Sequence, residues 1–231
     1  MKPVIRTENL CHVYSAGTPF QLTALENVQF EAYEGEFLAI IGHTGSGKST
    51  LIQHLNALIK PTSGAVYLDG QDINATKESV RAARFAVGLV FQYPEYQLFE
   101  ETVYKDVAFG PKNMKLSDAE IDARVREVAD FTGLDETVLQ ASPFELSGGQ
   151  KRRAAIAGVI AMRPRVLILD EPMAGLDPGG CREIMANIQR YHREKNATVI
   201  MVTHDMSQAA RTADRLVVMD KGKIAMTGTP A

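Results

Sequence analysis

The sequence predicts an α/β fold with a mostly parallel sheet, an antiparallel β subdomain at the N-terminus and an inserted α-helical subdomain. Three observations lead to this prediction. Short apolar runs typical of buried strands alternate with segments of helical spacing, as in a parallel sheet covered by helices. Two strands of alternating apolar residues precede that pattern. Between residues 98 and 160 the pattern becomes helical throughout, which indicates a helical insert.

Composition favours one globular domain over residues 1–231, with the helical subdomain at residues 98–160 inserted within it. The 231 residues are 45% hydrophobic and 23% charged, enough for a sizeable core. A formal net charge of -3 gives no basic footprint, so we expect no nucleic-acid partner. The longest apolar stretch, residues 154–162, is too short to span a bilayer, so any membrane role must come through a partner. Cys11 and Cys181 lack metal-site spacing, which is typical of reduced thiols in a cytosolic protein.

The elements follow from local patterns. Alternating apolar residues predict strands at residues 3–10 and 25–33. Five consecutive apolar residues predict a buried strand at residues 37–41, and leucines at helical spacing predict a helix at residues 48–58. A short strand at residues 65–68 follows the Lys-Pro-Thr-Ser-Gly turn.

The second half continues the alternation. Ser117 and Glu120 form the capping-box pattern that begins a helix in the insert. A helix is also expected at about residues 179–194. Further strands are predicted at residues 87–91, 166–169, 198–202 and 216–219.

Residues 42–49 read Gly-His-Thr-Gly-Ser-Gly-Lys-Ser and fit the P-loop pattern G-x-x-x-x-G-K-[ST], which predicts a P-loop NTPase core. The predicted strand before them and helix after them are the context that this pattern requires. Backbone N–H groups at the helix N-terminus would bind phosphate oxygens. Lys48 would reach the β and γ phosphates, and the Ser49 hydroxyl would bind Mg²⁺. His43 is expected to contribute its backbone only. The candidate nucleotide-binding residues of this loop are Gly42, His43, Thr44, Gly45, Ser46, Gly47, Lys48, Ser49 and Thr50.

The apolar strand at residues 166–169 ends in two acidic residues, Asp170 and Glu171. Carboxylates at the carboxyl end of a parallel strand lie at the ligand-binding edge of the sheet. We therefore expect Asp170 to hold Mg²⁺ and Glu171 to act as the general base for an attacking water. A solvated acidic pair after an edge strand is the alternative, and it fits poorly with so apolar a run.

A second glycine-bearing turn, Leu-Ser-Gly-Gly-Gln at residues 146–150, begins another predicted helix. Taken alone, it is most simply a helix cap. Ser147 and Gly149 could also bind an anion at the helix N-terminus. One nucleotide can use both glycine loops if two chains associate head to tail, so that the second loop closes on the partner's γ phosphate.

These three motifs, in this order, resemble the ATP-binding cassette (ABC) ATPases over essentially the whole chain. The resemblance implies ATP and Mg²⁺ as cofactors. It implies that Gln92 senses Mg²⁺ or the attacking water, that Asp177 works across a dimer interface, and that His204 binds the γ phosphate and holds Glu171. Tyr14 is implied to stack on adenine, with a place in the core as the alternative. The implied catalytic residues are thus Glu171, His204 and Gln92, and the implied metal ligands are Ser49, Gln92 and Asp170.

Residues 91–112 are similar to the ATPases of energy-coupling-factor importers, and residues 14–20 to the second of their two paired ATPases. This resemblance implies ATP-driven uptake of vitamins or transition-metal ions. It implies a heterodimer with a homologous ATPase, with a homodimer as the alternative, a transmembrane coupling subunit and substrate-binding membrane subunits. The location implied is peripheral, on the cytoplasmic side of a bacterial cell membrane.

Two alternatives remain open from the sequence. The chain could be the ATPase of another ABC transporter class, or, with less support, a non-transport ABC protein. The aromatic residues that follow Gln92 are expected to be exposed and to form a groove for the membrane partner. ABC ATPases of this kind usually extend beyond residue 231, so a C-terminal extension is expected to be absent from this chain.

Overall fold

The computed structural model describes residues 2–230, and its first sheet is antiparallel. That sheet is built on the long strand β1, which pairs with β2, β3 and β5, and β6 extends it beyond β5. The strand predicted at residues 25–33 is in fact two strands. The Thr7 hydroxyl bridges their break by donating to Val28 O at 2.8 Å and accepting from Phe30 N at 3.0 Å. The bounds are β1 Pro3–Tyr14, β2 Leu22–Val28, β3 Glu31–Tyr33, β5 Ser63–Leu68 and β6 Gln71–Asp72.

The second sheet has the order β11-β10-β4-β9-β8-β7 and is parallel except for the β10–β11 pair. Ile40 pairs with Val202 and Val202 pairs with Asp170, so the strands β4, β9 and β8 end level with one another. β11 was not predicted, because most of its residues are exposed and carry no apolar pattern. The bounds are β4 Phe37–Ile41, β7 Val87–Val90, β8 Val166–Asp170, β9 Thr198–Val202, β10 Arg215–Asp220 and β11 Lys223–Gly228.

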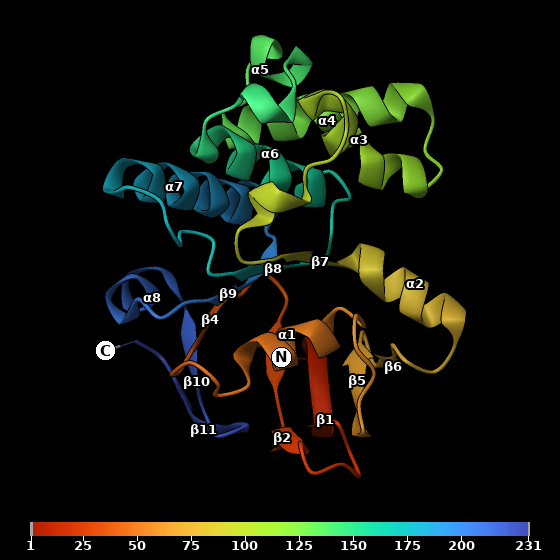
Figure 1. The fold of residues 1–231 in the computed structure, drawn as a ribbon, viewed down its shortest axis with the longest axis vertical. Coiled ribbons are helices and arrows are strands. Elements are labelled where there is room, and N and C mark those ends of the chain that lie inside the picture. The colour runs from red at the N-terminus through yellow and green to blue at the C-terminus, as the bar shows by residue number, and fades with distance from the viewer. Residues whose placement is uncertain (1, 231) are drawn as a thin grey trace.

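The strands β4, β7, β8, β9 and β10 pack into two hydrophobic cores, one on each face of the sheet. In β4, Phe37 and Ala39 belong to the core shared with the helices of the insert, while Leu38 and Ile40 pack with Leu51 of α1 and with the antiparallel sheet. Figure 1 shows the resulting layers, with α3, α4, α5 and α6 gathered on one side and α1 on the other. These features confirm the predicted fold class.

Most of the helices are preceded by a residue whose side chain caps the helix N-terminus. α2 starts at Thr76, whose hydroxyl accepts from Ser79 N, and it buries only Ala83. That weak apolar stripe explains why α2 was not predicted. The helix bounds are α1 Lys48–Leu55, α2 Lys77–Ala86, α3 Val103–Asn113, α4 Asp118–Thr132, α5 Glu136–Gln140, α6 Gly148–Ile160, α7 Pro178–Lys195 and α8 Met206–Thr212, with 3₁₀ turns η1 at Pro94–Gln97 and η2 at Pro143–Glu145.

The helix predicted to reach residue 58 ends at Leu55. Ala57 adopts a left-handed conformation with φ 54°, which cannot continue a right-handed helix. The side chain of Asn56 turns inward and donates to the carbonyl of Val87 at the start of β7. This hydrogen bond fixes the C-terminal end of α1 to the parallel sheet. Within residues 2–230, no helix combines the length and the apolar character needed to cross a membrane.

The packing of β5 against β1 leads to a stability prediction. Gly64 has φ +80°, and a Cβ there would collide with the backbone carbonyl of Asn9. Gly17 has the similar φ of +77°, but a Cβ there would meet nothing within 4 Å. We expect Gly17→Ala to cost about 1–2 kcal/mol of unfolding free energy from backbone strain alone. Gly64→Ala should cost about 3 kcal/mol or more, because the collision adds to that strain.

Urea-induced unfolding of both variants measures the difference. Equal losses of unfolding free energy would contradict the close approach of β5 to β1.

Candidate functional site

Three adjacent parallel strands bring the predicted site residues to one edge of the sheet. β4 leads into the loop of residues 42–47, β8 ends at Asp170, and β9 is followed closely by His204. Two hydrogen bonds extend the ladder past the strand ends: Glu171 N donates to Val202 O at 2.9 Å, and Thr203 N donates to Ile40 O at 3.2 Å. The site is thus built at the carboxyl ends of the strands, where α/β sheets bind ligands.

The loop before α1 is shaped by close backbone packing. A Cβ on Gly42, where φ is +153°, would collide with the carbonyl of Met219 in β10. Lys48 Nζ donates to the carbonyls of Gly42 at 2.8 Å and His43 at 3.0 Å, so its ammonium group lies inside the loop. Ser46 is fully buried, and its hydroxyl has no hydrogen-bond partner among the described residues. The loop therefore holds a fixed cation beside an unused donor at a helix N-terminus, which suits a phosphate.

Ser49 and Asp170 form a pair across the loop. The Ser49 hydroxyl donates to Asp170 Oδ2 at 3.3 Å, and Asp170 is 8% exposed. Burial is the main cause that raises the pKa of Asp170 above its ordinary value, with a smaller contribution from the neighbouring Glu171. A hydroxyl and a buried carboxylate are hard oxygen donors, which fit Mg²⁺.

The described residues hold no cluster of three acidic, histidine or cysteine side chains around one point.

Glu171 and His204 form the second pair of the site. His204 Nδ1 lies 2.9 Å from Glu171 Oε2, and the carboxylate requires that this nitrogen carry the proton. The histidine side chain is 78% exposed and the glutamate side chain 14% exposed. Glu171 also has φ +48°, a conformation that is strained for a residue with a side chain. The backbone strain and the histidine together fix the direction of this carboxylate.

Gln92 is exposed and lines the same cavity as Glu171 and His204. This cavity measures about 760 Å³ and is also lined by Tyr93 and Met173. The structure thus brings together Gln92, Glu171 and His204, while Asp170 lies at the end of β8 and contacts Ser49 in the first turn of α1.

Tyr14 lies at the border of α1, where it is 39% exposed. Its hydroxyl is 3.3 Å from the hydroxyl of Thr50, and its ring meets His12 edge to face at 4.4 Å. His12 Nδ1 is 3.2 Å from Nε2 of the fully buried His54, whose Nδ1 is 2.7 Å from Thr50 O. Because that carbonyl only accepts, His54 Nδ1 carries the proton and Nε2 accepts from His12. Sequence reasoning gave His12 and His54 no role, since residues 12 and 54 are far apart in the chain.

Two further predicted residues act as helix caps within the chain. Ser147 caps α6, and within the described residues its side chain bonds only to Gln150, as part of the capping box. Asp177 caps α7 by accepting from Gly179 N at 2.7 Å and Gly180 N at 3.0 Å, and these bonds hold its pKa below the ordinary value. Gly149 lies in the first turn of α6. α6 and α1 lie on opposite sides of the parallel sheet (Figure 1). Within the described residues, Ser147 is therefore separated from the loop of residues 42–49, and its side chain bonds to Gln150 instead.

Sequence reasoning missed Arg152, which is 1% exposed and forms an ion pair with Glu95. A signal was present, because Arg152, Ile156 and Ile160 recur at a spacing of four along α6, and all three are buried. A charged residue on a buried helix stripe requires a partner. Position in the sequence could not identify that partner, because Glu95 lies 57 residues away.

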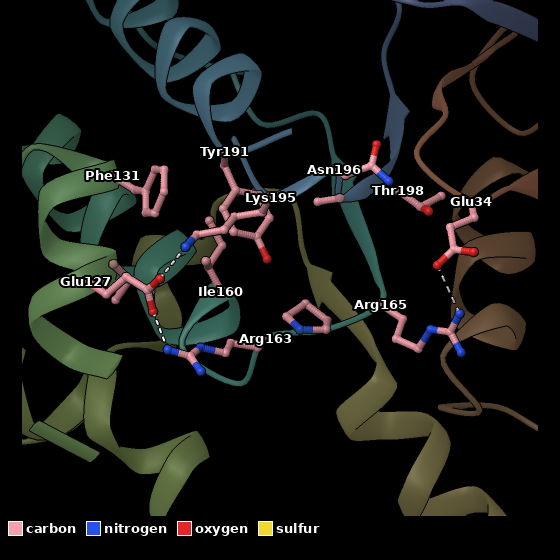
Figure 2. A pocket seen from close by; sticks show the side chains of 13 residues that line it. Glu34, Glu127, Phe131, Ile160, Arg163, Arg165, Tyr191, Lys195, Asn196 and Thr198 are labelled. Atoms are coloured by element: carbon pink, nitrogen blue, oxygen red, sulfur yellow. Dashed lines mark hydrogen bonds and ion pairs between the residues drawn. The ribbon is translucent and has the colours of Figure 1, made fainter. Parts of the chain in front are cut away.

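A separate cavity of about 430 Å³ lies at the opposite end of β8 (Figure 2). Glu127 accepts from Arg163 Nη2 and from Lys195 Nζ, each at 2.5 Å, so these charges are already compensated. Tyr191 lines the cavity, and burial raises its pKa to about 12, so its hydroxyl stays protonated. None of the predicted site residues lines this cavity.

Comparisons with known proteins agree with this geometry. Residues 25–174 match the model of the ABC transporter family. The energy-coupling factor transporter ATP-binding protein EcfA2 of Clostridium tetani is 57% identical over 230 residues, which cover 98% of this chain and 79% of the relative. EcfA2 of Caldanaerobacter subterraneus is 54% identical over 226 residues, with the same coverage of both chains.

Solved structures are also similar. The structure of cbiO1 from Clostridium perfringens, part of the ABC transporter complex cbiONQ, has a TM-score of 0.89 and 41% identity, and the match covers 100% of this chain and 90% of that one. A dimeric ATP-binding cassette in a post-hydrolysis state, bound to ADP and Pi, has a TM-score of 0.86 and 31% identity, and the match covers 98% of this chain and 99% of that one.

The contact between His54 and His12 leads to a prediction of how stability depends on pH. Burial is the main cause that lowers the pKa of His54 from 6.5 to about 4. Between pH 6.5 and about 4, His54 is therefore protonated in the unfolded chain but neutral in the folded chain. Stability from neutral His54 is fully present above pH 6.5 and is lost as pH falls towards 4, by up to about 3 kcal/mol.

NMR titration of the histidine ring protons checks this prediction. His43 is the internal control, because hydrogen bonds to the carbonyl of Thr44 and to Asp220 raise its pKa above the ordinary value. A His54 midpoint near 6.5 would contradict the buried, neutral ring. The variant His54→Gln should flatten the dependence of unfolding free energy on pH over the same range.

Proposed function

Because this chain belongs to the ABC transporter family, we propose that it is the ATP-hydrolysing subunit of an energy-coupling factor importer. The observation that carries the proposal is the pair of contacts at the sheet edge: Ser49 with Asp170, and Glu171 with His204. The first offers oxygen ligands beside a phosphate loop, and the second offers an oriented base. Relatives that are identical to this chain at more than half of the aligned residues carry the energy-coupling factor name.

The loop of residues 42–49 would bind the triphosphate. Its N–H groups and the hydroxyl of Ser46 would donate to phosphate oxygens, and Lys48 would exchange its two carbonyl partners for the β and γ phosphates. Mg²⁺ held by Ser49 and Asp170 would neutralise charge on the β and γ phosphates. Tyr14 would present its ring face to the adenine, with His12 and the Thr50 hydroxyl fixing its position.

Hydrolysis would proceed from a water molecule placed between Glu171 and the γ phosphate. Glu171 would accept a proton from this water as its oxygen bonds to the γ phosphorus, and the bond to the β–γ bridging oxygen would break to release ADP. His204 would keep the carboxylate aimed through Nδ1, and as the imidazolium, with both ring nitrogens protonated, it would also donate from Nε2 to the γ phosphate. Gln92, on the wall of the same cavity, would contact Mg²⁺ or the attacking water through its amide.

The α6 N-terminus supports a head-to-tail dimer. Within residues 2–230, a Cβ on Gly148 or Gly149 would meet nothing within 4 Å, so contacts among these residues give no reason for glycine at either position. Glycine in a helix is also about 1 kcal/mol less favourable than alanine. Close approach of a partner's phosphate to Ser147 and Gly149 would account for both glycines. Asp177 would lie at the same interface, in addition to capping α7.

The segment after Gln92 supports docking to a transmembrane coupling subunit, which would carry the substrate-binding membrane subunits. Tyr96 is 84% exposed and Phe99 is 60% exposed, while Pro94 is buried and Leu98 packs on the core. Phe99 meets Phe109 of α3 edge to face at 5.0 Å, which extends the apolar surface. An exposed aromatic group of this kind is typical of a binding surface.

The proposal also covers the partner, the location and the transported solute. The ATPase partner would be a homologous chain in a heterodimer, and the complex would lie on the cytoplasmic side of a bacterial cell membrane. The solute would be a vitamin or a transition-metal ion, which other subunits would contact. We further propose that residues 98–160 form a helical subdomain inserted within a single domain of residues 1–231.

Glu171→Gln is the variant that tests the proposed function. Glutamine keeps the shape of the side chain but cannot accept the proton of the water, so ATP hydrolysis should fall by about 10²–10⁴-fold. Nucleotide binding should persist, and a nucleotide-bound dimer should accumulate. Phosphate release and size-exclusion chromatography measure the two effects, with the exposed Glu78→Gln on α2 as the control. Hydrolysis near the wild-type rate would show that Glu171 is not the base.

The docking surface is tested by replacing Tyr96 and Phe99 together with serine. ATP binding by the isolated chain should be nearly unchanged, because both side chains are exposed and lie outside the loop of residues 42–49. Assembly with the membrane subunits and solute uptake in reconstituted vesicles should be lost. Phe20→Ser is a matched control, since Phe20 is 85% exposed but lies in the loop between β1 and β2. Normal uptake by the double variant would rule out this surface as the docking site.

A further inference from the structure

One buried charge has no part in the roles described above. Arg152 on α6 is 1% exposed, and a buried charge is costly unless it is paired and fully hydrogen-bonded. Its guanidinium donates two hydrogen bonds to Glu95, from Nε to Oε2 at 3.0 Å and from Nη2 to Oε1 at 2.6 Å. Its third nitrogen, Nη1, donates to the carbonyl of Pro172 at 3.2 Å and to the carbonyl of Ala174 at 2.6 Å.

These partners come from the segments that carry the candidate catalytic residues. Glu95 lies in η1, three residues after Gln92. Pro172 and Ala174 lie in the turn that follows Glu171, whose backbone is closed by a hydrogen bond from Ala174 N to Glu171 O at 3.0 Å. Arg152 itself is on the helix that Ser147 caps. One side chain therefore links three segments that are distant in the sequence.

We propose that Arg152 is a positioning residue that locks the η1 turn and the turn after Glu171 to α6, so that the three segments move as one body when nucleotide binds. The part of the proposal that concerns nucleotide rests on the function proposed above. A contact between the γ phosphate and Gln92 or Glu171 would then also shift the Ser147 turn and the aromatic residues of η1. Arg152 would act through these segments and would not touch the nucleotide.

The geometry of the guanidinium explains why arginine is needed here. Its planar fork holds a carboxylate with two parallel bonds and still directs Nη1 at two carbonyls on another side. A lysine ammonium would keep the charge but could not hold acceptors in both directions at once. Arg152→Lys should therefore leave the fold intact and loosen the link.

The chain offers a matched control. Arg215 Nε and Nη2 bind Glu36 at 2.6 Å and 3.0 Å, and Nη2 also donates to the carbonyl of Glu31 at 2.7 Å. These side chains are 21% and 10% exposed, so the pair is partly buried. It joins the start of β10 to the start of β4, away from the carboxyl ends of the strands. Arg215→Lys therefore makes the same chemical change without touching the three segments.

Amide hydrogen exchange of the full chain tests the proposal, first without nucleotide. The reporters are the turn amides of Tyr96, Ala174 and Leu176, which donate to Tyr93 O, Glu171 O and Met173 O. In Arg152→Lys, exchange should become about tenfold faster in both turns together, because hydrogen bonds to a charged group are lost. Exchange in the loop of residues 42–49 should be unchanged. Arg215→Lys should leave both turns as in the wild type.

The second arm adds ATP and Mg²⁺ in the Glu171→Gln background, which prevents turnover. ATP should slow exchange in residues 42–49 and, in the protein with Arg152, also in η1 and in the turn after Glu171. With Arg152→Lys, protection should remain at residues 42–49 and fail to reach η1. A role of Arg152 in stability alone would not separate these two regions.

Each outcome decides a different point. A folded Arg152→Lys variant with wild-type exchange in both turns would overturn the proposal. If ATP protects no part of residues 42–49 even with Arg152 present, the proposed function fails, and the nucleotide-free arm still decides the role of Arg152. If Arg152→Lys does not fold, the double variant Arg152→Met with Glu95→Leu removes both charges at similar volume. Wild-type exchange in both of its turns would then overturn the proposal.

Discussion

The level alignment of three parallel strands is the constraint on which the rest of the structure depends. Because Ile40, Val202 and Asp170 are in register, the loops that follow β4, β9 and β8 begin at the same height. The backbone register therefore brings the candidate phosphate loop, the acidic pair and His204 to one edge of the sheet, where their side chains come into contact. The two hydrophobic cores keep this register, since each strand buries alternate residues on opposite faces.

Buried polar groups then refine the positions that the sheet sets. Glu171 is held in a left-handed conformation, and His204 fixes its carboxylate. His54 is kept neutral by burial and orients His12 against Tyr14. Arg152 fixes the turns that follow Gln92 and Glu171. In each case a costly group, strained or desolvated, persists because its surroundings compensate it, and each lies at a segment that would contact nucleotide or a partner.

The sequence was most informative where one element follows another directly. The strands at residues 37–41 and 198–202 have the predicted bounds, because continuous apolar runs occur in strands buried on both faces. The contacts of Ser49 with Asp170 and of Glu171 with His204 agree with roles inferred from motif order, although those roles stay proposals. The exposed elements α2 and β11 carried too little apolar pattern to be predicted.

The contacts among Tyr14, His12 and His54, and those of Arg152, could not be predicted from the sequence for another reason. Both depend on partners that are distant in the chain, 42 residues for the contact between His12 and His54 and 57 residues for that between Arg152 and Glu95. A spacing pattern within one helix can show that a charged residue is buried, but only the packed structure shows what compensates it. The most direct measurement of the whole account is a crystal structure with Mg²⁺ and a non-hydrolysable ATP analogue. We expect the triphosphate on the N–H groups of residues 42–49, with the metal between the Ser49 hydroxyl and the Asp170 carboxylate. A nucleotide bound elsewhere, or a metal that contacts neither residue, would contradict this expectation.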